Sequence, residues 1–373
     1  MLNKKYLLTI SSIILTSSFL LYKLYDYFNE ENKLNKFNQI SIDKIIIYPV
    51  KACKGIEVKK CKLTEYGFEN DRRWMVIKDN RYVGQKPYPV LSTVKTEFSE
   101  DGLFLIISKA GIKKQLKIST KPLSSSEMNP ELIYSNISTL DNISQCYDQG
   151  DEAAQWFSNI MNDSSGTIRF VQMCPPDLWK RNIRKHIGDN LKTNSTNQDN
   201  EKEYKNSLSN SCQIMFLSKS SIDDLNKRVE KNRIENGESI KDKPSLKYDR
   251  FRPNLIINGT TPFQEDHWKS IEIENKSETT TTTIELKIAD GNARCPVVTI
   301  DQDMGVLDPY NDDEPLRTLK TFRKVDCVIG QKVLFGTYAV TNPKDLGKFI
   351  YVGDKINILQ VGFSSNFYSK IPK

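Results

Sequence analysis

The pair Arg294-Cys295 is the part of this sequence that could most directly do chemistry. It stands in the run GNARCPVVTIDQDMG (residues 291–305), where a β-branched segment and an acidic turn ending at Gly305 follow the cysteine. A fixed positive charge beside a thiol at a strand edge favours the thiolate, the form that binds a soft metal. Most strand cysteines, however, are only packed in a core. The pair alone leaves a metal ligand and a core residue both open.

Further basic residues occur where strands are expected to meet turns. Lys51 and Lys54 lie in YPVKACKG (48–55), Arg72 in NDRRW (70–74) and Arg252 in FRPN (251–254). A phosphate or pterin ligand is best held by planar, bidentate donors on rigid backbone, which Arg at a strand end provides. Taken singly, each residue is better explained as a solvated charge or the partner of a nearby acid than as a ligand-binding residue.

The composition excludes several classes of function. The net charge of +7 is spread along 373 residues without a Lys/Arg block, so nucleic acid is not an expected partner. Seven cysteines without a CxxC pair indicate a reducing compartment, and two histidines cannot form a three-histidine zinc site. No GxGxxG or GxxxxGK[ST] motif is present, which argues against the usual nucleotide sites.

The N-terminal segment predicts a membrane anchor over residues 1–28. Residues 6–22 are uncharged and flanked by Lys and Tyr, as at a membrane interface. A cleaved signal peptide is the competing interpretation, but no small-x-small cleavage site follows. Residues 29–38 then read as a charged tether.

The remaining sequence predicts an α+β protein that is mostly β. Residues 40–50, 74–78, 103–108, 114–118 and 167–172 alternate like strands, and Asp151–Met161 and 220–232 have helical periodicity. The polar stretch 189–211 indicates a mobile surface loop. Few helices among many short strands favour barrel architecture.

The motifs YPVKACKG, NDRRW, FRPN, NARCPVVTIDQDMG and EPLRTLKTFR, in this order, resemble the mitochondrial amidoxime-reducing component family. That family is a membrane-anchored branch of the molybdenum-cofactor sulfurase C-terminal (MOSC) domain superfamily. The resemblance runs from about residue 40 to residue 362. It implies an N-terminal MOSC-N β-barrel domain over residues 39–165 and a MOSC β-barrel domain over residues 166–365, with the polar insertion 189–211.

The resemblance also implies roles for individual residues. Cys295 corresponds to the thiolate that ligates molybdenum and is the catalytic residue. The positions that correspond to contacts with the molybdenum cofactor, Mo-molybdopterin, are Lys51, Arg72, Ser211, Arg252, Arg294 and Tyr338. A soft thiolate suits molybdenum, and an anionic cofactor needs several cations around it.

The implied activity is reduction of N-hydroxylated compounds, amidoximes and hydroxylamines, with electrons from cytochrome b5 and its NADH-dependent reductase. The implied location is the mitochondrial outer membrane, with the body facing the cytosol. Two alternatives stay open: a sulfur carrier with a persulfide on Cys295, and a non-catalytic, membrane-tethered cofactor-binding protein.

Two segments near Cys295 have more than one interpretation. The acidic turn 301–305 departs from calcium-loop spacing, and a structural turn with Asp301 paired to a neighbouring Arg is preferred. The segment EPLRTLKTFRK from Glu314 has a helical period and a basic end. It is either a plain surface helix or a docking site for an acidic partner.

Overall fold

The computed structural model describes residues 39–121, 124–139, 142–187, 191, 204–241, 243–276, 281–310, 313–327 and 330–363. The expected anchor (1–28) and tether (29–38) lie outside these residues. Within the described ranges, no helix is both long and apolar enough to cross a membrane.

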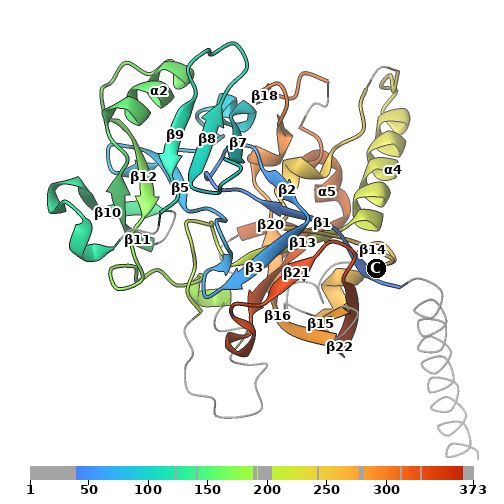
Figure 1. The fold of residues 1–373 in the computed structure, drawn as a ribbon. Coiled ribbons are helices and arrows are strands. Elements are labelled where there is room, and N and C mark those ends of the chain that lie inside the picture. The colour runs from blue at the N-terminus through green and yellow to red at the C-terminus, as the bar shows by residue number, and fades with distance from the viewer. Residues whose placement is uncertain are drawn as a thin grey trace, which may run out of the picture. The chain divides into compact units, whose positions relative to one another are not determined.

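The first half of the described chain forms a small closed barrel (Figure 1). Its strands are, in spatial order, β10 (Ile133–Thr139), β11 (Asn142–Asp148), β12 (Ile168–Met173), β5 (Trp74–Lys78) and β6 (Arg81–Tyr82). A sheet of β7 (Lys95–Phe98), β8 (Phe104–Ser108) and β9 (Leu116–Ser119) and the helix α2 (Asp151–Met161) share a hydrophobic core with it. Trp156 and Phe157 of α2 carry this packing, with Phe157 stacked on Phe170 of β12 at 4.8 Å between ring centroids.

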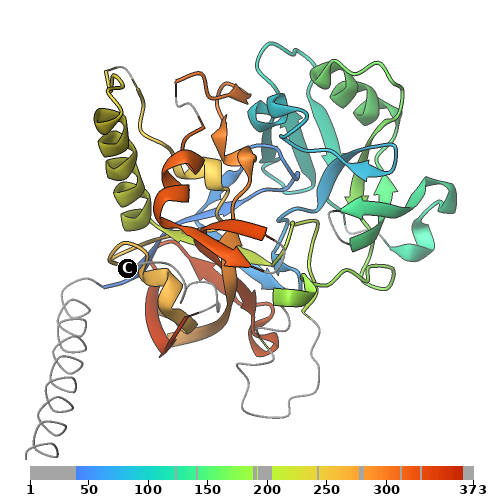
Figure 2. The ribbon, with the colours of Figure 1, turned by 180° about the vertical axis from the view of Figure 1, so that it is seen from behind.

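A larger sheet forms the second half and is seen from both sides in Figures 1 and 2. Its strand order is β13 (Ile214–Ser218), β14 (Leu255–Asn258), β1 (Ser41–Ile47), β22 (Lys355–Val361), β15 (Trp268–Lys276), β16 (Thr281–Ala293), β20 (Gly330–Thr341) and β19 (Lys324–Cys327). Pairing of β13 with β20 closes the sheet into a second barrel.

Strand β1 comes early in the sequence but belongs to the second barrel. It lies between β14 and β22 of the second barrel and also pairs with β2 (Ile56–Val58), although it precedes every strand of the first barrel in the chain. Strand β12, conversely, belongs to the first barrel although it follows residue 165. The two barrels are therefore interleaved in sequence.

The remaining elements are short. Helix α4 (Lys219–Glu235) begins at Ser218, whose hydroxyl accepts a hydrogen bond from the Ser221 amide, and it packs on β13 and β14. Helix α5 (Leu316–Phe322) packs on β20. The other strands are β3 (Lys60–Thr64), β4 (Gly67–Phe68), β17 (Ile300–Asp301), β18 (Val306–Leu307) and β21 (Phe349–Tyr351). The 3-10 helices are η1 (Pro89–Thr93), η2 (Ser125–Glu127), η3 (Pro130–Leu132), η4 (Tyr248–Phe251), η5 (Gln264–His267), η6 (Pro296–Thr299) and η7 (Pro343–Asp345).

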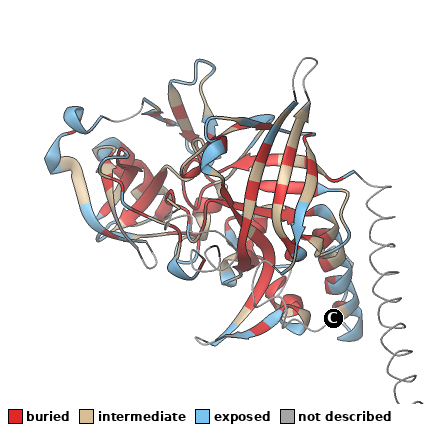
Figure 3. Cartoon of the chain, turned by 90° about the horizontal axis from the view of Figure 1, so that it is seen from below, coloured by how far each residue is buried: buried red, intermediate tan, exposed pale blue. Residues whose placement is uncertain are grey.

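The mostly-β prediction with few helices is confirmed, and the predicted strand 74–78 and helix Asp151–Met161 coincide with β5 and α2. Two predictions were wrong. The β-branched run after Cys295 begins as η6, because Pro296 opens a 3-10 turn there, and the adjoining strand is β16 before it. Residues 206–209 of the polar stretch 189–211 are not a surface loop but are buried. Figure 3 shows the buried residues of the described chain in red.

The burial of that stretch has a physical cause. The guanidinium of Arg181 donates to the carbonyl oxygens of Ser207, Ser209 and Asn210, so polar backbone is satisfied away from water. Leu208 adds an apolar contact to the core around Trp179. Residues 192–203 of the stretch lie outside the described part of the chain.

Candidate functional site

The end of β1 brings two arginines onto one aromatic ring. The guanidinium carbons of Arg72 and Arg252 lie 4.5 and 4.3 Å from the ring centroid of Tyr48. Arg72 is further held by Asp71, by the side-chain oxygen of Asn254 at 2.9 Å and by the carbonyl of Arg252 at 3.2 Å. Two like charges are therefore fixed beside each other, and the carboxylate of Asp71 pairs with Arg72.

Both arginines occupy an uncommon backbone conformation. Arg72 has φ 51° and Arg252 has φ 53°, in the left-handed region that a side chain with a Cβ rarely adopts. Such conformations cost about 1–3 kcal/mol each and persist where surrounding contacts hold them, often at functional sites. In this chain they turn NDRRW and FRPN toward the same tyrosine.

Lys51 is the most deeply buried cation of this group, with 4% of its surface exposed. Its ammonium lies 4.0 Å from the ring centroid of Tyr82 and has no hydrogen-bond partner. Burial, and then repulsion from Arg181 and Arg72, holds the pKa of Lys51 well below its usual 10.5. An anion placed here would relieve both penalties.

Cys295 lies two residues after the end of β16 and is exposed. The other cysteines with described burial, by contrast, are buried: Cys53, Cys61, Cys146, Cys174 and Cys212. Burial raises the pKa of Cys53, Cys61, Cys174 and Cys212 to about 12, which leaves these thiols protonated and unreactive at neutral pH. Cys295 is thus the thiol best placed to meet a ligand among those described.

Arg294 clamps the segment that carries Cys295. Its Nε and Nη2 donate to the carbonyl of Phe335 on β20, and its Nη1 donates to the carbonyl of Phe251 at 3.0 Å. The guanidinium therefore ties the end of β16 to the residue just before Arg252.

Tyr338 and Ser211 lie on the other flank. The Tyr338 hydroxyl donates to the side-chain oxygen of Asn292 at 2.8 Å, and Asn292 stands three residues before Cys295. Burial raises the pKa of Tyr338, while the neighbouring Arg294 charge and the Ser211 hydroxyl lower it.

The structure brings the residues predicted from sequence into one neighbourhood. Arg72 and Arg252 share Tyr48, Arg294 reaches the residue before Arg252, and Tyr338 lies beside Arg294 and Ser211. Tyr82 connects the two halves, since it covers Lys51 and lies within electrostatic range of Arg252 and Cys295. Their roles toward a ligand stay a prediction.

Sequence reasoning missed several members of this neighbourhood. Tyr48 and Asn292 stood inside quoted motifs but were not singled out. Arg181 and Arg184 influence Lys51 electrostatically and belong to the basic run WKRNIRKH (179–186), which could have been noticed. Tyr82 had no signal, because an aromatic residue in a short strand is usually only packed.

The donors of this site fit an anionic, oxygen-rich group. Among the described residues, the buried atoms Lys51 Nζ, Arg252 Nη2, Tyr48 OH and Thr337 Oγ1 have no hydrogen-bond partner. Buried donors left unpaired are costly and uncommon in folded proteins. Unpaired cationic donors in the neighbourhood of an exposed thiol match a phosphate-bearing metal cofactor, with the thiol toward a soft metal.

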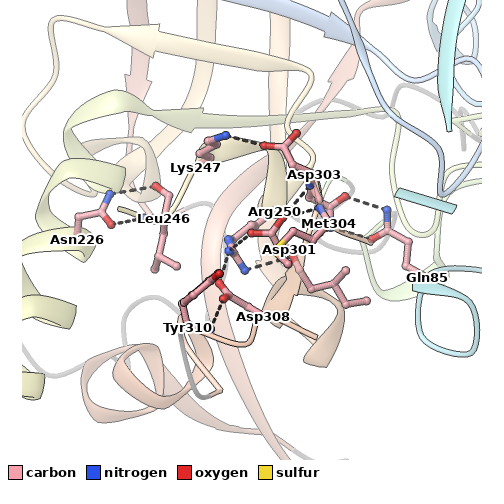
Figure 4. Close-up of polar contacts among 12 residues, drawn as sticks. Gln85, Asn226, Leu246, Lys247, Arg250, Asp301, Asp303, Met304, Asp308 and Tyr310 are labelled. Carbon is pink, nitrogen blue, oxygen red and sulfur yellow. Dashed lines mark hydrogen bonds and ion pairs between the residues drawn. The ribbon is translucent and has the colours of Figure 1, made fainter. Parts of the chain in front are cut away.

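The acidic turn 301–305 has the structural role expected of it. Asp301 pairs with Arg250 at 3.3 Å, and its carboxylate accepts hydrogen bonds from the backbone amides of Asp303 and Met304, as Figure 4 shows. Gly305 has φ 67°, and Thr93 Cγ2 lies 2.6 Å from where a Cβ would stand, so only glycine fits. In the described part of the chain no cluster of three His, Cys, Asp or Glu could hold a metal ion.

Two arginines of the basic segment after Glu314 form ion pairs within the chain. Arg317 binds Glu238 and Glu314, and Arg323 binds Asp266 at 2.6 Å. Docking of an acidic partner on this segment stays a prediction.

Comparison with known families identifies two regions of the chain. Residues 39–164 match the family described as the MOSC N-terminal beta barrel domain, and residues 203–357 match the MOSC domain.

Similar proteins are found along most of the length. Mitochondrial amidoxime reducing component 2 of Bos taurus is 30% identical over 331 residues, covering 86% of this chain and 81% of that protein. Human mitochondrial amidoxime-reducing component 1 is 29% identical over 330 residues, with 86% and 83% covered. The molybdenum cofactor sulfurase of Arabidopsis thaliana is 28% identical over 321 residues, which are 85% of this chain but 35% of the sulfurase.

Proposed function

Because this chain belongs to the MOSC domain family, we propose that it is a molybdenum-cofactor-dependent oxidoreductase acting on N-hydroxylated compounds. The substrates would be amidoximes, as the names of its amidoxime-reducing relatives indicate, and by the same N–O chemistry hydroxylamines. The observation that carries the proposal is the exposed thiol of Cys295 beside buried cations with unpaired donors.

The residues divide the binding of the cofactor between them. Lys51, Arg72 and Arg252 would hold its anionic end, because Lys51 and Arg252 have unpaired donors there and all three bring positive charge. Cys295 would provide the thiolate for molybdenum, and Ser211 and Tyr338 would line the pterin side. When bound, the cofactor supplies the two-electron chemistry that cleaves the N–O bond.

The chain's own contribution is orientation and electrostatics. Arg294, fixed by the carbonyls of Phe335 and Phe251, keeps Cys295 at a constant position relative to Arg252. Tyr82 covers Lys51 and keeps water from its ammonium, so the charge acts at low dielectric. Lys51 can accept a proton when the anion arrives, since burial holds its pKa low beforehand.

Electrons must reach the site from another protein, because the sequence has no haem, flavin or iron–sulfur signature. The proposed donors are cytochrome b5 and its NADH-dependent reductase. The proposed location is the mitochondrial outer membrane, with residues 1–28 as the anchor and the body in the cytosol.

Reconstitution tests this function. Full-length protein would be assayed for molybdenum, pterin and reduction of an aryl amidoxime with cytochrome b5, its reductase and NADH. Cys295→Ser is expected to lose molybdenum and turnover, whereas Cys61→Ser, at a buried cysteine of β3, should retain both. Full molybdenum and undiminished reduction in Cys295→Ser would rule out the ligand assignment.

A sulfur carrier is the second candidate, and the similarity to molybdenum cofactor sulfurase favours it. In that case Cys295 would carry a persulfide, which cyanide releases as thiocyanate. Cyanide-labile sulfur that depends on Cys295, in protein without molybdenum, would support the carrier over the reductase. Bound pterin without turnover of any N-hydroxylated substrate would instead indicate a non-catalytic cofactor-binding protein.

A further inference from the structure

The acidic turn (residues 301–305) is linked to three of the segments that carry a cation or thiol of the candidate site. One such segment is the Lys51 turn (residues 49–54), and another is the Arg252 loop (residues 247–254). The third is the Cys295 segment (residues 293–299), which leads directly into the turn. Figure 4 shows Lys247 and Arg250 of the Arg252 loop, together with Gln85, around the acidic turn.

Gln302 makes the connection to the Lys51 turn. Its carboxamide and that of Gln85 exchange two hydrogen bonds, Gln85 Nε2 to Gln302 Oε1 at 2.9 Å and Gln302 Nε2 to Gln85 Oε1 at 3.1 Å. Gln85 Nε2 also donates to the carbonyl of Ala52 at 2.7 Å, next to Lys51. Both side chains are buried, so these bonds are shielded from competing water.

Asp303 and Asp301 make the connections to the Arg252 loop. Asp303 accepts from Lys247 and from Lys54, each at 2.6 Å, and thereby joins that loop to the Lys51 turn. These two ammonium groups lower the pKa of Asp303 to about 2. Asp301 pairs with Arg250, which also binds Asp308 and the carbonyl of Ile300 at 3.2 Å.

We propose that the acidic turn is a common brace for the cofactor-binding segments, and that Gln302 is the positioning residue that couples the Lys51 turn to the Cys295 segment. Gln302 touches neither a cofactor nor a substrate. It fixes the separation between the anion-binding cation and the thiol, much as outer-shell partners fix metal ligands. The inference deepens the proposed function and rests on it for the identity of the ligand.

Amide hydrogen exchange on the full-length chain tests the brace without any assay of activity. Gln302→Ala is expected to raise exchange by about tenfold at the amides of the Lys51 turn, which bond to Trp74 and Val94, because local opening becomes easier. The matched control is Asn226→Ala, which removes two side-chain bonds to the backbone of Leu246 and leaves the brace intact. Exchange at the Lys51 turn should not change in the control.

Gln85→Ala and the double variant complete a cycle. Because Gln302 reaches the Lys51 turn only through Gln85, which itself bonds to Ala52, the double variant should open the Lys51 turn no more than Gln85→Ala alone does. Asp303→Asn, at a half-exposed position, should loosen the Lys51 turn and the Arg252 loop together, because it weakens the ion pairs with both. Unchanged exchange in all these variants, or an equal rise over the whole chain, would overturn the proposal.

Cofactor content provides the second readout. Gln302→Ala is expected to retain severalfold less pterin and molybdenum after gel filtration than the Asn226→Ala control. Retention equal to the control, in a wild type that does bind the cofactor, would also overturn it. If the wild type binds no molybdenum, the proposed function fails, whereas the exchange experiment still decides whether the brace exists.

Discussion

Lys51 is a buried cation whose neighbours are mainly other cations, and its chemistry can be examined without any ligand. Burial and the charges of Arg181 and Arg72 make its ammonium form costly in the free protein. The same arrangement would favour an anion bound beside it. The free protein would thus be less stable, and an anion would bind to it more tightly.

Lys51→Met should therefore stabilise the cofactor-free protein near neutral pH, by about 1 kcal/mol or more. The folded pKa of Lys51 is lowered from 10.5, so between the two values the unfolded chain binds the extra proton. The wild-type free energy of unfolding must then rise with pH in that window, and Lys51→Met must lack this rise. Urea unfolding from about pH 7 to about pH 10 measures both curves; parallel curves would contradict the assignment.

Tyr48 provides a second prediction for a single residue. Its hydroxyl is buried without a hydrogen-bond partner, so Tyr48→Phe should leave the free energy of unfolding unchanged or raise it by about 1 kcal/mol. Tyr48→Leu removes the ring that contacts Arg72 and Arg252 and should lower the free energy of unfolding by about 2–4 kcal/mol. Chemical denaturation of cofactor-free protein compares the pair. Equal losses in both variants would show that the ring has no special role.

The sequence predicted the site as separate motifs but not as an arrangement. Lys51, Arg72, Arg252 and Cys295 each stood beside a Pro, Gly or strand boundary that marked them. Their convergence depends on β1 lying next to β14, a pairing between residues more than two hundred positions apart in the chain. No local pattern encodes such a pairing. The amide pair of Gln85 and Gln302 escaped for the same reason.

At the scale of elements, the bend of β20 at Gly336 holds the Arg294 clamp. Gly336 has φ 75°, and a Cβ there would lie 2.4 Å from Met215 Cε, 3.0 Å from the Phe216 carbonyl and 3.2 Å from Arg294 Nη2. Strand β20 pairs with both β13 and β16 across this bend. The close approach of the three strands therefore requires glycine.

Gly336→Ala should lower the free energy of unfolding by about 3 kcal/mol or more, through backbone strain and overpacking together. Gly237→Ala is the matched control, because Gly237 has a similar φ of 69° but nothing within 4 Å of its Cβ position. Gly237→Ala should lower the free energy of unfolding by about 1 kcal/mol, because only the backbone conformation is strained. Denaturant midpoints give the comparison. Similar losses would mean that space at β20 is not limiting.

Helices were predicted more closely than buried loops. Helix α2 has a wide apolar face and acidic residues in its first turn, so its sequence carries both its period and its start. Residues 206–209 look like solvent-exposed chain by composition, yet Arg181 satisfies their backbone from a distance. The composition of a polar segment shows that its burial is unfavourable. It does not show whether a residue elsewhere in the chain supplies the hydrogen bonds that make burial possible.

For the whole molecule, the division into two barrels does not follow the division of the sequence. Strand β1 lies inside the second barrel between β14 and β22, and β12 lies inside the first. The domain boundary near residue 165 stays a prediction. A cut at that residue would not separate two independent sheets, because β1 and β12 lie on the other side of it from the rest of their barrels.

Removal of residues 1–165 should therefore leave a chain that does not fold. The fragment 166–363 lacks β1, so β14 and β22 would face each other across a missing strand with unpaired backbone groups. Circular dichroism and urea titration should show no cooperative transition, whereas fragment 39–363 should unfold in one transition. Supplying residues 39–65 in trans should partly restore the β signal, because that segment contains β1, β2 and β3. Cooperative unfolding of 166–363 alone would show that the second barrel closes without β1, and the shared sheet would then not be what joins the two halves.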